Sequence, residues 1–188
     1  MTSLLVRDAG FADADAVARI HVRSWQTAYR GLIDQPFLDA LSIPDRAERW
    51  RGIFVDPHPL TLGTLVAERD STIVGWTSFG ASRDADLDGL TEPCERPEEA
   101  PAPGGEIYGI YADPAAWSVG VGHALLTAAE GRMADAGHTR AHLWVLDGND
   151  RADTFYARHG WAADGAMKFE ERPGLILAEH RRVKLLSE

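Results

Sequence analysis

The sequence lacks the features that mark secreted, membrane-spanning and disulfide-rich proteins. Its only cysteine is Cys94, so it can form no internal disulfide and no cysteine-based metal cluster. No apolar run approaches the roughly 20 residues that a membrane-spanning helix needs. The first residues, MTSLLVRDAG, lack the basic and apolar pattern of a secretory signal. We therefore expect a cytoplasmic protein without membrane association.

Basic residues are also scarce. The chain has 19 Lys and Arg against 29 Asp and Glu, which gives a formal net charge of -10. Nucleic-acid binding needs clustered basic residues, so we expect no nucleic-acid partner. The acidity mildly favours cationic ligands such as amines, but simple solubility is the preferred explanation for it. The 188 residues suffice for one domain with a core, and we expect a single domain over 1–188.

Hydrophobic periodicity predicts strands and helices in mixed order. Strands are expected at 3–9, 105–112, 140–146, 166–171 and 180–186, and a hairpin at 64–80. Helices are expected at 13–29, 119–136 and 149–161, with shorter helical segments at 35–41 and 44–54. This order predicts an α/β or α+β fold in which helices cover a mixed sheet.

Residues 82–105 interrupt these patterns. The segment is rich in proline, glycine and acidic residues and shows no periodicity, so it is predicted to be a long surface loop. It is either a solvated insertion or the rim of a substrate site. Cys94 lies within it and has no neighbouring residue that would activate a thiol, so we do not interpret it as a nucleophile.

The stretch ADPAAWSVGVGHALL, residues 112–126, places Gly120 and Gly122 where a helix is expected to begin. Unpaired N–H groups and the helix dipole make a helix start a binding site for phosphate, and glycine lets a diphosphate approach the backbone. There is no lysine for a P-loop, and Leu125 replaces the third glycine of a dinucleotide fingerprint. Close helix packing is the alternative explanation for the two glycines.

The surrounding residues resemble the GNAT superfamily of acyl-CoA-dependent N-acyltransferases. That family carries the motif (Arg/Gln)-x-x-Gly-x-(Gly/Ala), in which x is any residue, where a helix follows the fourth strand. Trp117, Gly120 and Gly122 occupy these positions, after an Asp113-Pro114 turn that is frequent in the family.

A second signature of the family follows at a consistent distance. Asn149 after the fifth expected strand, Tyr156 in the next helix and Gly160-Trp161 match it, so the resemblance is strong over residues 104–162. Residues 22–41 resemble the first helices of a bacterial subgroup more weakly. The resemblance implies a mostly antiparallel sheet that splays between strands four and five, with acetyl-CoA as the cosubstrate.

The resemblance also implies a set of coenzyme-binding residues. These are Ile110, Tyr111, Ala112, Trp117, Ser118, Val119, Gly120, Val121, Gly122, His123, Asn149 and Tyr156. Ile110 and Ala112 would present backbone groups to the pantetheine arm, and Gly109 would mark a local bulge. Trp117 departs from the usual Arg or Gln, and Val119 and His123 stand where basic residues are common. We therefore expect weak coenzyme affinity or a phosphate contact from elsewhere in the chain.

Two residues are candidates for the chemistry. Glu106 opens its strand fourteen residues before Gly120, the spacing of the glutamate base in family members that use one, and would take a proton from the amine. Its alternative is a solvated residue at a strand end. Tyr156 would donate a proton to the leaving thiolate, and its alternative is a core aromatic.

The expected reaction is acetyl transfer to a primary amine of a small molecule, by direct attack in a ternary complex. Trp25 and Tyr29 either border the acceptor or pack in the core. A non-catalytic acyl-CoA-binding module and a protein N-terminal or lysine acetyltransferase remain alternatives. A homodimer is possible. We expect no metal, because His138 and His142, four residues apart, span a loop-to-strand stretch in which that spacing does not place them on one face.

Overall fold

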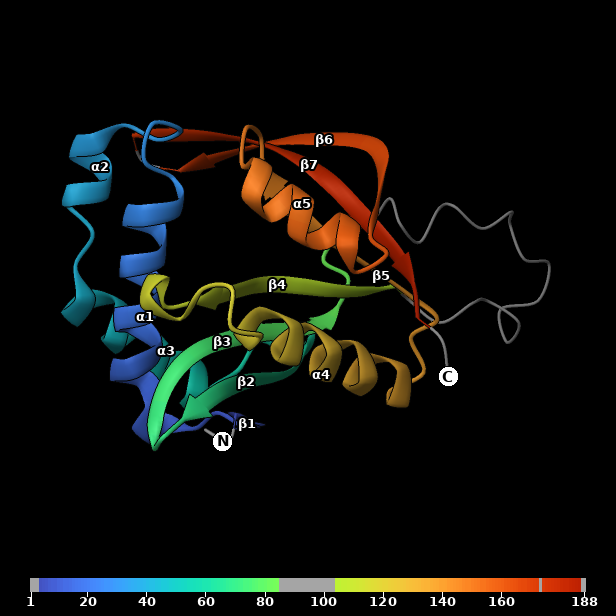
Figure 1. Cartoon of the computed structure of the whole chain (residues 1–188), viewed down its shortest axis with the longest axis horizontal. Coiled ribbons are helices and arrows are strands. Elements are labelled where there is room, and N and C mark those ends of the chain that lie inside the picture. The colour runs from blue at the N-terminus through green and yellow to red at the C-terminus, as the bar shows by residue number, and fades with distance from the viewer. Residues whose placement is uncertain (1–3, 85–103, 173, 187–188) are drawn as a thin grey trace.

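The computed structural model of the protein describes residues 4–84, 104–172 and 174–186. Its strands are β1 (Leu4–Asp8), β2 (Thr61–Arg69), β3 (Thr72–Ala81), β4 (Gly105–Ala112), β5 (Arg140–Leu146), β6 (Ala162–Arg172) and β7 (Leu175–Leu185). Its helices are α1 (Ala14–Ala28), α2 (Gln35–Asp39), α3 (Ile43–Val55), α4 (Val121–Asp135) and α5 (Asp150–Arg158), with short 3-10 turns η1 (Phe11–Asp13) and η4 (Pro114–Ala116). One seven-stranded sheet has the order β1-β2-β3-β4-β5-β7-β6 (Figure 1).

The sheet is splayed at its centre, as predicted. Every neighbouring pair of strands is antiparallel except β4 and β5, which run parallel and pair only between Gly105–Ile107 and Ala141–Leu143. Beyond Ile107, β4 continues beside β3 alone. A register shift makes Tyr108 an extra residue on β4, directly before Gly109, and such a bulge bends a strand. The predicted fold class is therefore confirmed.

Helices cover both faces of the β1–β4 half of the sheet. On β2, Leu65 and Ala67 pack with the buried side chains of α4, whereas Val66 points to the opposite face and packs with α1 and α3. Successive side chains of a strand alternate between faces, so a strand covered on both sides reads as an uninterrupted apolar run. Burial of each such side chain contributes about 1.5–3 kcal/mol. The two helical layers hold β4 in place beside the splay.

Several boundaries differ from the prediction. Helix α4 begins at Val121 rather than at residue 119, because Ser118 (φ 63°) and Gly120 (φ 91°) have left-handed backbones that a helix cannot contain. Strands β6 and β7 are longer than the predicted 166–171 and 180–186. Much of this hairpin is polar and half-exposed, so the apolar pattern marked only part of each strand. In the segment 82–105, Gly105 already belongs to β4, and residues 85–103 lie outside the described residues.

Candidate active site

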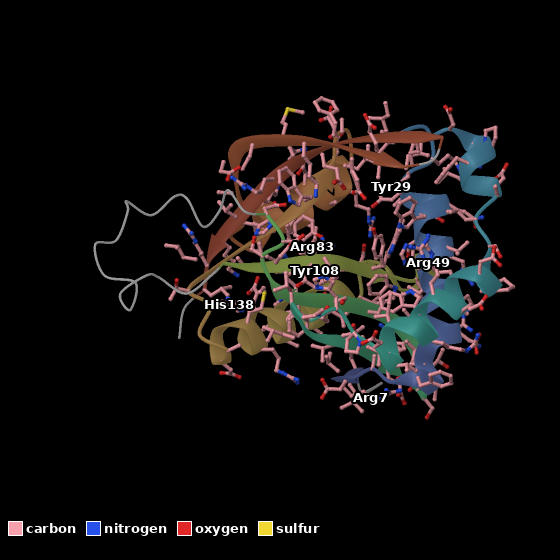
Figure 2. The ribbon with its side chains drawn as sticks, turned by 180° about the vertical axis from the view of Figure 1, so that it is seen from behind. Arg7, Tyr29, Arg49, Arg83, Tyr108 and His138 are labelled. Carbon is pink, nitrogen blue, oxygen red and sulfur yellow. The ribbon has the colours of Figure 1, made fainter. Side chains whose placement is uncertain are left out.

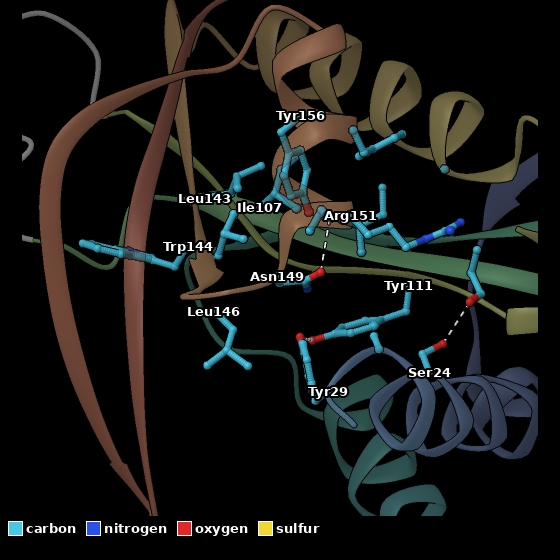
Figure 3. Close-up of a pocket in the computed structure, with 18 of the residues that line it drawn as sticks. Ser24, Tyr29, Ile107, Tyr111, Leu143, Trp144, Leu146, Asn149, Arg151 and Tyr156 are labelled. Carbon is cyan, nitrogen blue, oxygen red and sulfur yellow. Dashed lines mark hydrogen bonds between the residues drawn. The ribbon is translucent and has the colours of Figure 1, made fainter. Parts of the chain in front are cut away.

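A cleft of about 940 Å³ lies where β4 and β5 separate. One part, which we call the helix half, is lined by residues from the segment 116–123, before and in α4, and from the segment 149–159, of and around α5. The other part, the hairpin half, is lined by the end of α1, Arg83, Glu106, Tyr108, Trp144 and the β6–β7 hairpin. Figure 3 shows Tyr156, Asn149 and Arg151 facing Tyr111 and Tyr29 across this opening.

The two glycines of the helix half serve different purposes. Gly120 is the N-cap of α4 and has φ 91°, a conformation that costs other residues roughly 1–2 kcal/mol. The first N–H groups of the helix have no partner within it, and residues 118–120 are exposed, so these amides are open to an anion. Gly122 is a packing residue, because a Cβ there would lie 3.2 Å from the Phe155 ring of α5. The left-handed backbone therefore explains Gly120, and helix packing explains Gly122.

Trp117 is fixed at the entrance of the helix half. Its indole Nε1–H donates to the carbonyl of Ala112 at 2.9 Å, and the Ser24 hydroxyl of α1 donates to the same oxygen at 2.9 Å. Both lone pairs of that carbonyl are thereby used. The guanidinium carbon of Arg151 lies 4.0 Å from the centre of a Trp117 ring, the geometry of a cation–π contact.

The open edge of β4 lies between the two halves. Ile110 and Ala112 are two residues apart, so their main-chain groups point to the same edge of the strand. Ser24 and Trp117 occupy the Ala112 carbonyl, whereas the backbone groups of Ile110 have no β5 partner, because the pairing of β4 with β5 ends at Ile107. Tyr111 reaches across to α1, where its hydroxyl lies 3.2 Å from that of Tyr29.

Asn149 and Tyr156 come from opposite ends of α5. Asn149 is the N-cap, and its side-chain oxygen accepts from the Ala152 N–H at 3.2 Å, which leaves its amide nitrogen for other partners. Tyr156 is 8% exposed and lines the cleft. Burial raises the pKa of its hydroxyl well above the usual value, with further contributions from Tyr111 and Asp153. The phenol therefore keeps its proton at neutral pH.

His123 and His159 form a second contact between α4 and α5. Nδ1 of His123 lies 3.0 Å from Nε2 of His159, whose Nδ1 lies 2.7 Å from the Phe155 carbonyl. Because a carbonyl only accepts, we assign the proton on Nδ1 of His159 to that bond. The pair closes one side of the helix half.

Glu106 is the centre of a buried charge network. Its side chain is almost fully buried, and its carboxylate accepts hydrogen bonds from the backbone N–H and the guanidinium of Arg83. Its Oε2 lies 3.8 Å from Nε2 of His142, which is 3.1 Å from an Asp84 carboxylate oxygen. Burial lowers the pKa of His142, although Glu106 and Asp84 oppose the shift. Glu106 is thus a paired, inward-facing carboxylate and not a solvated strand end.

Aromatic rings in the hairpin half carry cations of the chain itself. Arg83 lies 4.2 Å above the Tyr108 ring (Figure 2), and the Lys168 ammonium lies 4.4 Å from a ring centre of Trp144. The Trp144 indole donates to Asp84 at 2.7 Å. Burial raises the pKa of Tyr108 to about 12. These rings are therefore already covered by charged side chains, and Tyr108 is protonated at neutral pH.

Apolar packing closes the far end of the hairpin half. A buried cluster joins α1, the segment before α2, α2, β5 and β7 through Trp25, Ile33, Leu38, Leu146 and Leu177. Trp25 is therefore a core residue that also borders the cleft. Tyr29 packs against this cluster, and burial raises the pKa of its hydroxyl.

The matched family fits this geometry. Residues 19–161 match the model of the acetyltransferase (GNAT) family. The chain belongs to this family. Like the GNAT sequence signatures, the match spans the helix start at Gly120 and the α5 segment. No helix of the described residues is long and apolar enough to cross a membrane, and those residues contain no group of three or more potential metal ligands.

A curated relative and solved structures support this GNAT assignment. The chain is 26% identical over 145 residues to the uncharacterized N-acetyltransferase YuaI of Bacillus subtilis, covering 77% of this chain and 72% of that protein. Its fold is similar to PaiA N-acetyltransferase from Thermoplasma acidophilum in complex with coenzyme A, with TM-score 0.68, 20% identity, and 97% and 99% of the two chains covered. It is also similar to YncA of Salmonella typhimurium with its cofactor acetyl-CoA, with TM-score 0.65, 18% identity, and 98% and 95% covered.

The structure brings most of the sequence-predicted residues into one cleft. Those that line it are Glu106, Ile110, Tyr111, Ala112, Trp117, Ser118, Gly120, Gly122, His123, Asn149 and Tyr156. Val119 and Val121 are not among its lining residues: Val119 is exposed, and the Val121 side chain is buried in the core. Any role of Val121 in binding would have to come from its backbone.

Sequence reasoning missed several polar residues of the cleft and its network. They are Arg83, Asp84, His142, Arg151, Lys168 and Glu179. For Arg151 a signal existed, since it lies two residues after the Asn149 that the family signature had marked. The others come from segments far apart in the sequence, and no local spacing connects them.

Proposed function

We propose that the protein transfers the acetyl group of acetyl-CoA to a primary amine of a small molecule, by direct attack in a ternary complex. The observation that carries this proposal is the continuous cleft at the splay, which joins an anion-binding helix start to a buried carboxylate. PaiA and YncA, with similar folds, were solved with coenzyme A and acetyl-CoA. Acetyl-CoA would place its diphosphate in the helix half and its pantetheine arm along the open edge of β4.

The chemistry is assigned to groups at the middle of the cleft. The amine nitrogen attacks the thioester carbonyl carbon, the C–N bond forms, and the C–S bond breaks. Glu106 is the proposed acceptor of the ammonium proton, because its carboxylate lines the cleft, where Arg83 holds it by hydrogen bonds. Tyr156 is the proposed donor to the thiolate, because burial keeps its hydroxyl protonated.

The closed end of the hairpin half favours a small acceptor. The cluster around Leu38 and Leu177 packs α1 and α2 against β7, so an acceptor must fit between these elements and β4. Carboxylates of Glu106, Glu170 and Glu179 line this half, against the cations of Arg83 and Lys168. This excess of negative charge suits an ammonium group.

The test measures thiol release from acetyl-CoA with a panel of small primary amines and of peptides with free N-termini or lysines, with product masses. We expect transfer to one class of small amines. Transfer to peptides alone would replace the small-molecule proposal with a protein acetyltransferase. Binding of acetyl-CoA without transfer to any acceptor would indicate a non-catalytic binding module.

A further inference from the structure

The loop before α4 is short of positive charge for a diphosphate ligand. Residues 117–122 are Trp-Ser-Val-Gly-Val-Gly, with no Lys or Arg. Backbone amides supply hydrogen bonds there, but charge-assisted bonds are roughly twice as strong as neutral ones. A dianionic group bound at this loop therefore calls for a cation from another element.

Arg151 is placed to be that cation. It lies in the first turn of α5, lines the helix half together with Ser118, Gly120 and Gly122, and has an exposed side chain. Its guanidinium carbon lies 4.0 Å from a ring centre of Trp117. The side chain of α5 that contacts Trp117 thus carries the positive charge that the loop lacks.

The stacking leaves the hydrogen-bond donors of Arg151 available. The 4.0 Å distance brings the guanidinium over the ring, and a guanidinium that stacks on a ring keeps its five N–H donors in its own plane, where they match phosphate oxygens in pairs. Trp117 is itself held by its hydrogen bond to the Ala112 carbonyl, which Ser24 also contacts. The indole is therefore a fixed platform that limits the positions of the arginine before a ligand arrives.

We propose that Arg151, positioned by Trp117, binds the diphosphate of acetyl-CoA and replaces a cation on the loop. This inference rests on the proposed function, because it takes acetyl-CoA as the ligand of the helix half. Arg158, the other arginine lining this half, is seven residues further along α5, about 10 Å along the helix axis. It is too far along the helix to share the Trp117 platform.

The test compares binding of CoA, 3′-dephospho-CoA and pantetheine to the full chain by calorimetry. We expect Arg151→Ala to weaken CoA and dephospho-CoA equally, by roughly 10- to 100-fold, and to leave pantetheine, which has no phosphate, unchanged. If Arg151→Ala weakened the binding of CoA but not of dephospho-CoA, Arg151 would contact the ribose 3′-phosphate, and the inference would be overturned. A similar effect on pantetheine would overturn it in favour of a structural role.

A charge-relocation variant sharpens the test. Trp117→Arg in the Arg151→Ala background returns a cation to the loop, and we expect it to recover most of the lost affinity for CoA. Trp117→Ala alone should weaken CoA binding several-fold, because Arg151 loses its platform, whereas Trp117→Phe should weaken it less. No recovery in the double variant, together with equal effects of the Ala and Phe substitutions, would contradict the pairing.

The control is Arg49→Ala, which removes an exposed arginine of α3 outside the cleft (Figure 2). It should leave CoA affinity unchanged, and an equal loss there would overturn a specific role for Arg151. If the original chain binds CoA and Arg151→Ala does not weaken this binding, this inference alone is overturned. Failure of the original chain to bind CoA or acetyl-CoA overturns the proposed function as well.

Discussion

The two halves of the cleft are built in different ways. The helix half comes from two short segments, 116–123 and 149–159, and its lining combines helix-start backbone amides, two glycines and the exposed arginines of α5. The hairpin half draws side chains from α1, β4, β5, β6, β7 and Arg83, which follows β3, and contains the ion pair between Arg83 and the buried Glu106. The first arrangement suits a ligand whose anionic groups do not vary. In the second, the ligand that fits depends on which side chains the strands carry.

This contrast separates the expected effects of mutation. Changes in the hairpin half should alter the chemical step or the acceptor, because its charged groups lie where the amine would react. Changes in the helix half, apart from Tyr156 with its proposed role in the chemistry, should alter coenzyme affinity and leave the chemical step intact. A substitution that moved both quantities together would weaken the division.

The largest effect is expected at Glu106. Glu106→Gln removes the proposed proton acceptor and keeps the size of the side chain, so kcat should fall by about 10²- to 10⁴-fold. The acidic limb of the pH–rate profile should also flatten, and the KM for acetyl-CoA should change little. Steady-state kinetics from pH 5 to 9 measure these quantities.

A matched variant for Glu106 is Arg83→Gln, which keeps the carboxylate and removes its guanidinium partner. Its kcat should fall less than that of Glu106→Gln, because the carboxylate that accepts the proton is still present. An unchanged acidic limb in Glu106→Gln would show that another group accepts the proton.

The next largest effect is expected at Tyr156. Tyr156→Phe removes the hydroxyl that would protonate the thiolate, so kcat should fall roughly 10- to 100-fold, the loss of one hydrogen bond to a charged group. Calorimetric affinity for CoA should stay within a few-fold. Phe155→Leu, which changes the adjacent packing residue, is the comparison for damage to α5. Normal turnover in Tyr156→Phe would remove this residue from the proton-donor role.

The backbone of the helix half can be tested with two glycines of one helix. Gly120→Ala places a side chain at φ 91° and should lower the free energy of unfolding by about 1–2 kcal/mol, with weaker CoA binding as the amides move. Gly131→Ala lies in the same helix with open space around it and should stabilise the protein by roughly 0.5–1 kcal/mol. Denaturant unfolding and calorimetry measure both. Equal changes in stability and CoA affinity in the two variants would contradict the requirement for a left-handed backbone at Gly120.

The two halves also differ in how far the sequence predicted them. Gly120, Asn149 and Tyr156 lie in short motifs with fixed spacing, so their arrangement followed from local pattern and family resemblance. The network of Arg83, Glu106 and His142 joins residues up to 59 positions apart in the sequence: Arg83 follows β3, and the other two lie on β4 and β5. Its geometry depends on strand register and on the bulge at Tyr108, which no periodicity in the sequence encodes. The lengths of the polar strands β6 and β7 were underpredicted for the same reason, because they are set by the pairing of the two strands and not by an apolar pattern.

The smallest effect, and one confined to the hairpin half, is the pH dependence of stability from His142. Burial lowers the pKa of this imidazole in the folded protein; Asp84 and Glu106 oppose the shift, while Arg181 adds to it. The unfolded chain therefore binds the proton first, so the free energy of unfolding should fall as the pH drops below about 6.5, by at most about 1.4 kcal/mol per pH unit.

Urea unfolding at pH 8, 6.5 and 5.5 measures this slope. His142→Gln replaces the imidazole with a neutral amide and should reduce the loss of stability between pH 6.5 and 5.5. His58→Gln alters an exposed histidine and should retain the original slope. A slope that His142→Gln leaves unchanged would assign the pH dependence to other groups. The carboxylates of Asp13 and Asp153, whose pKa values are lowered by Arg7 and by Arg182 and His180 respectively, titrate in a separate window below about pH 4.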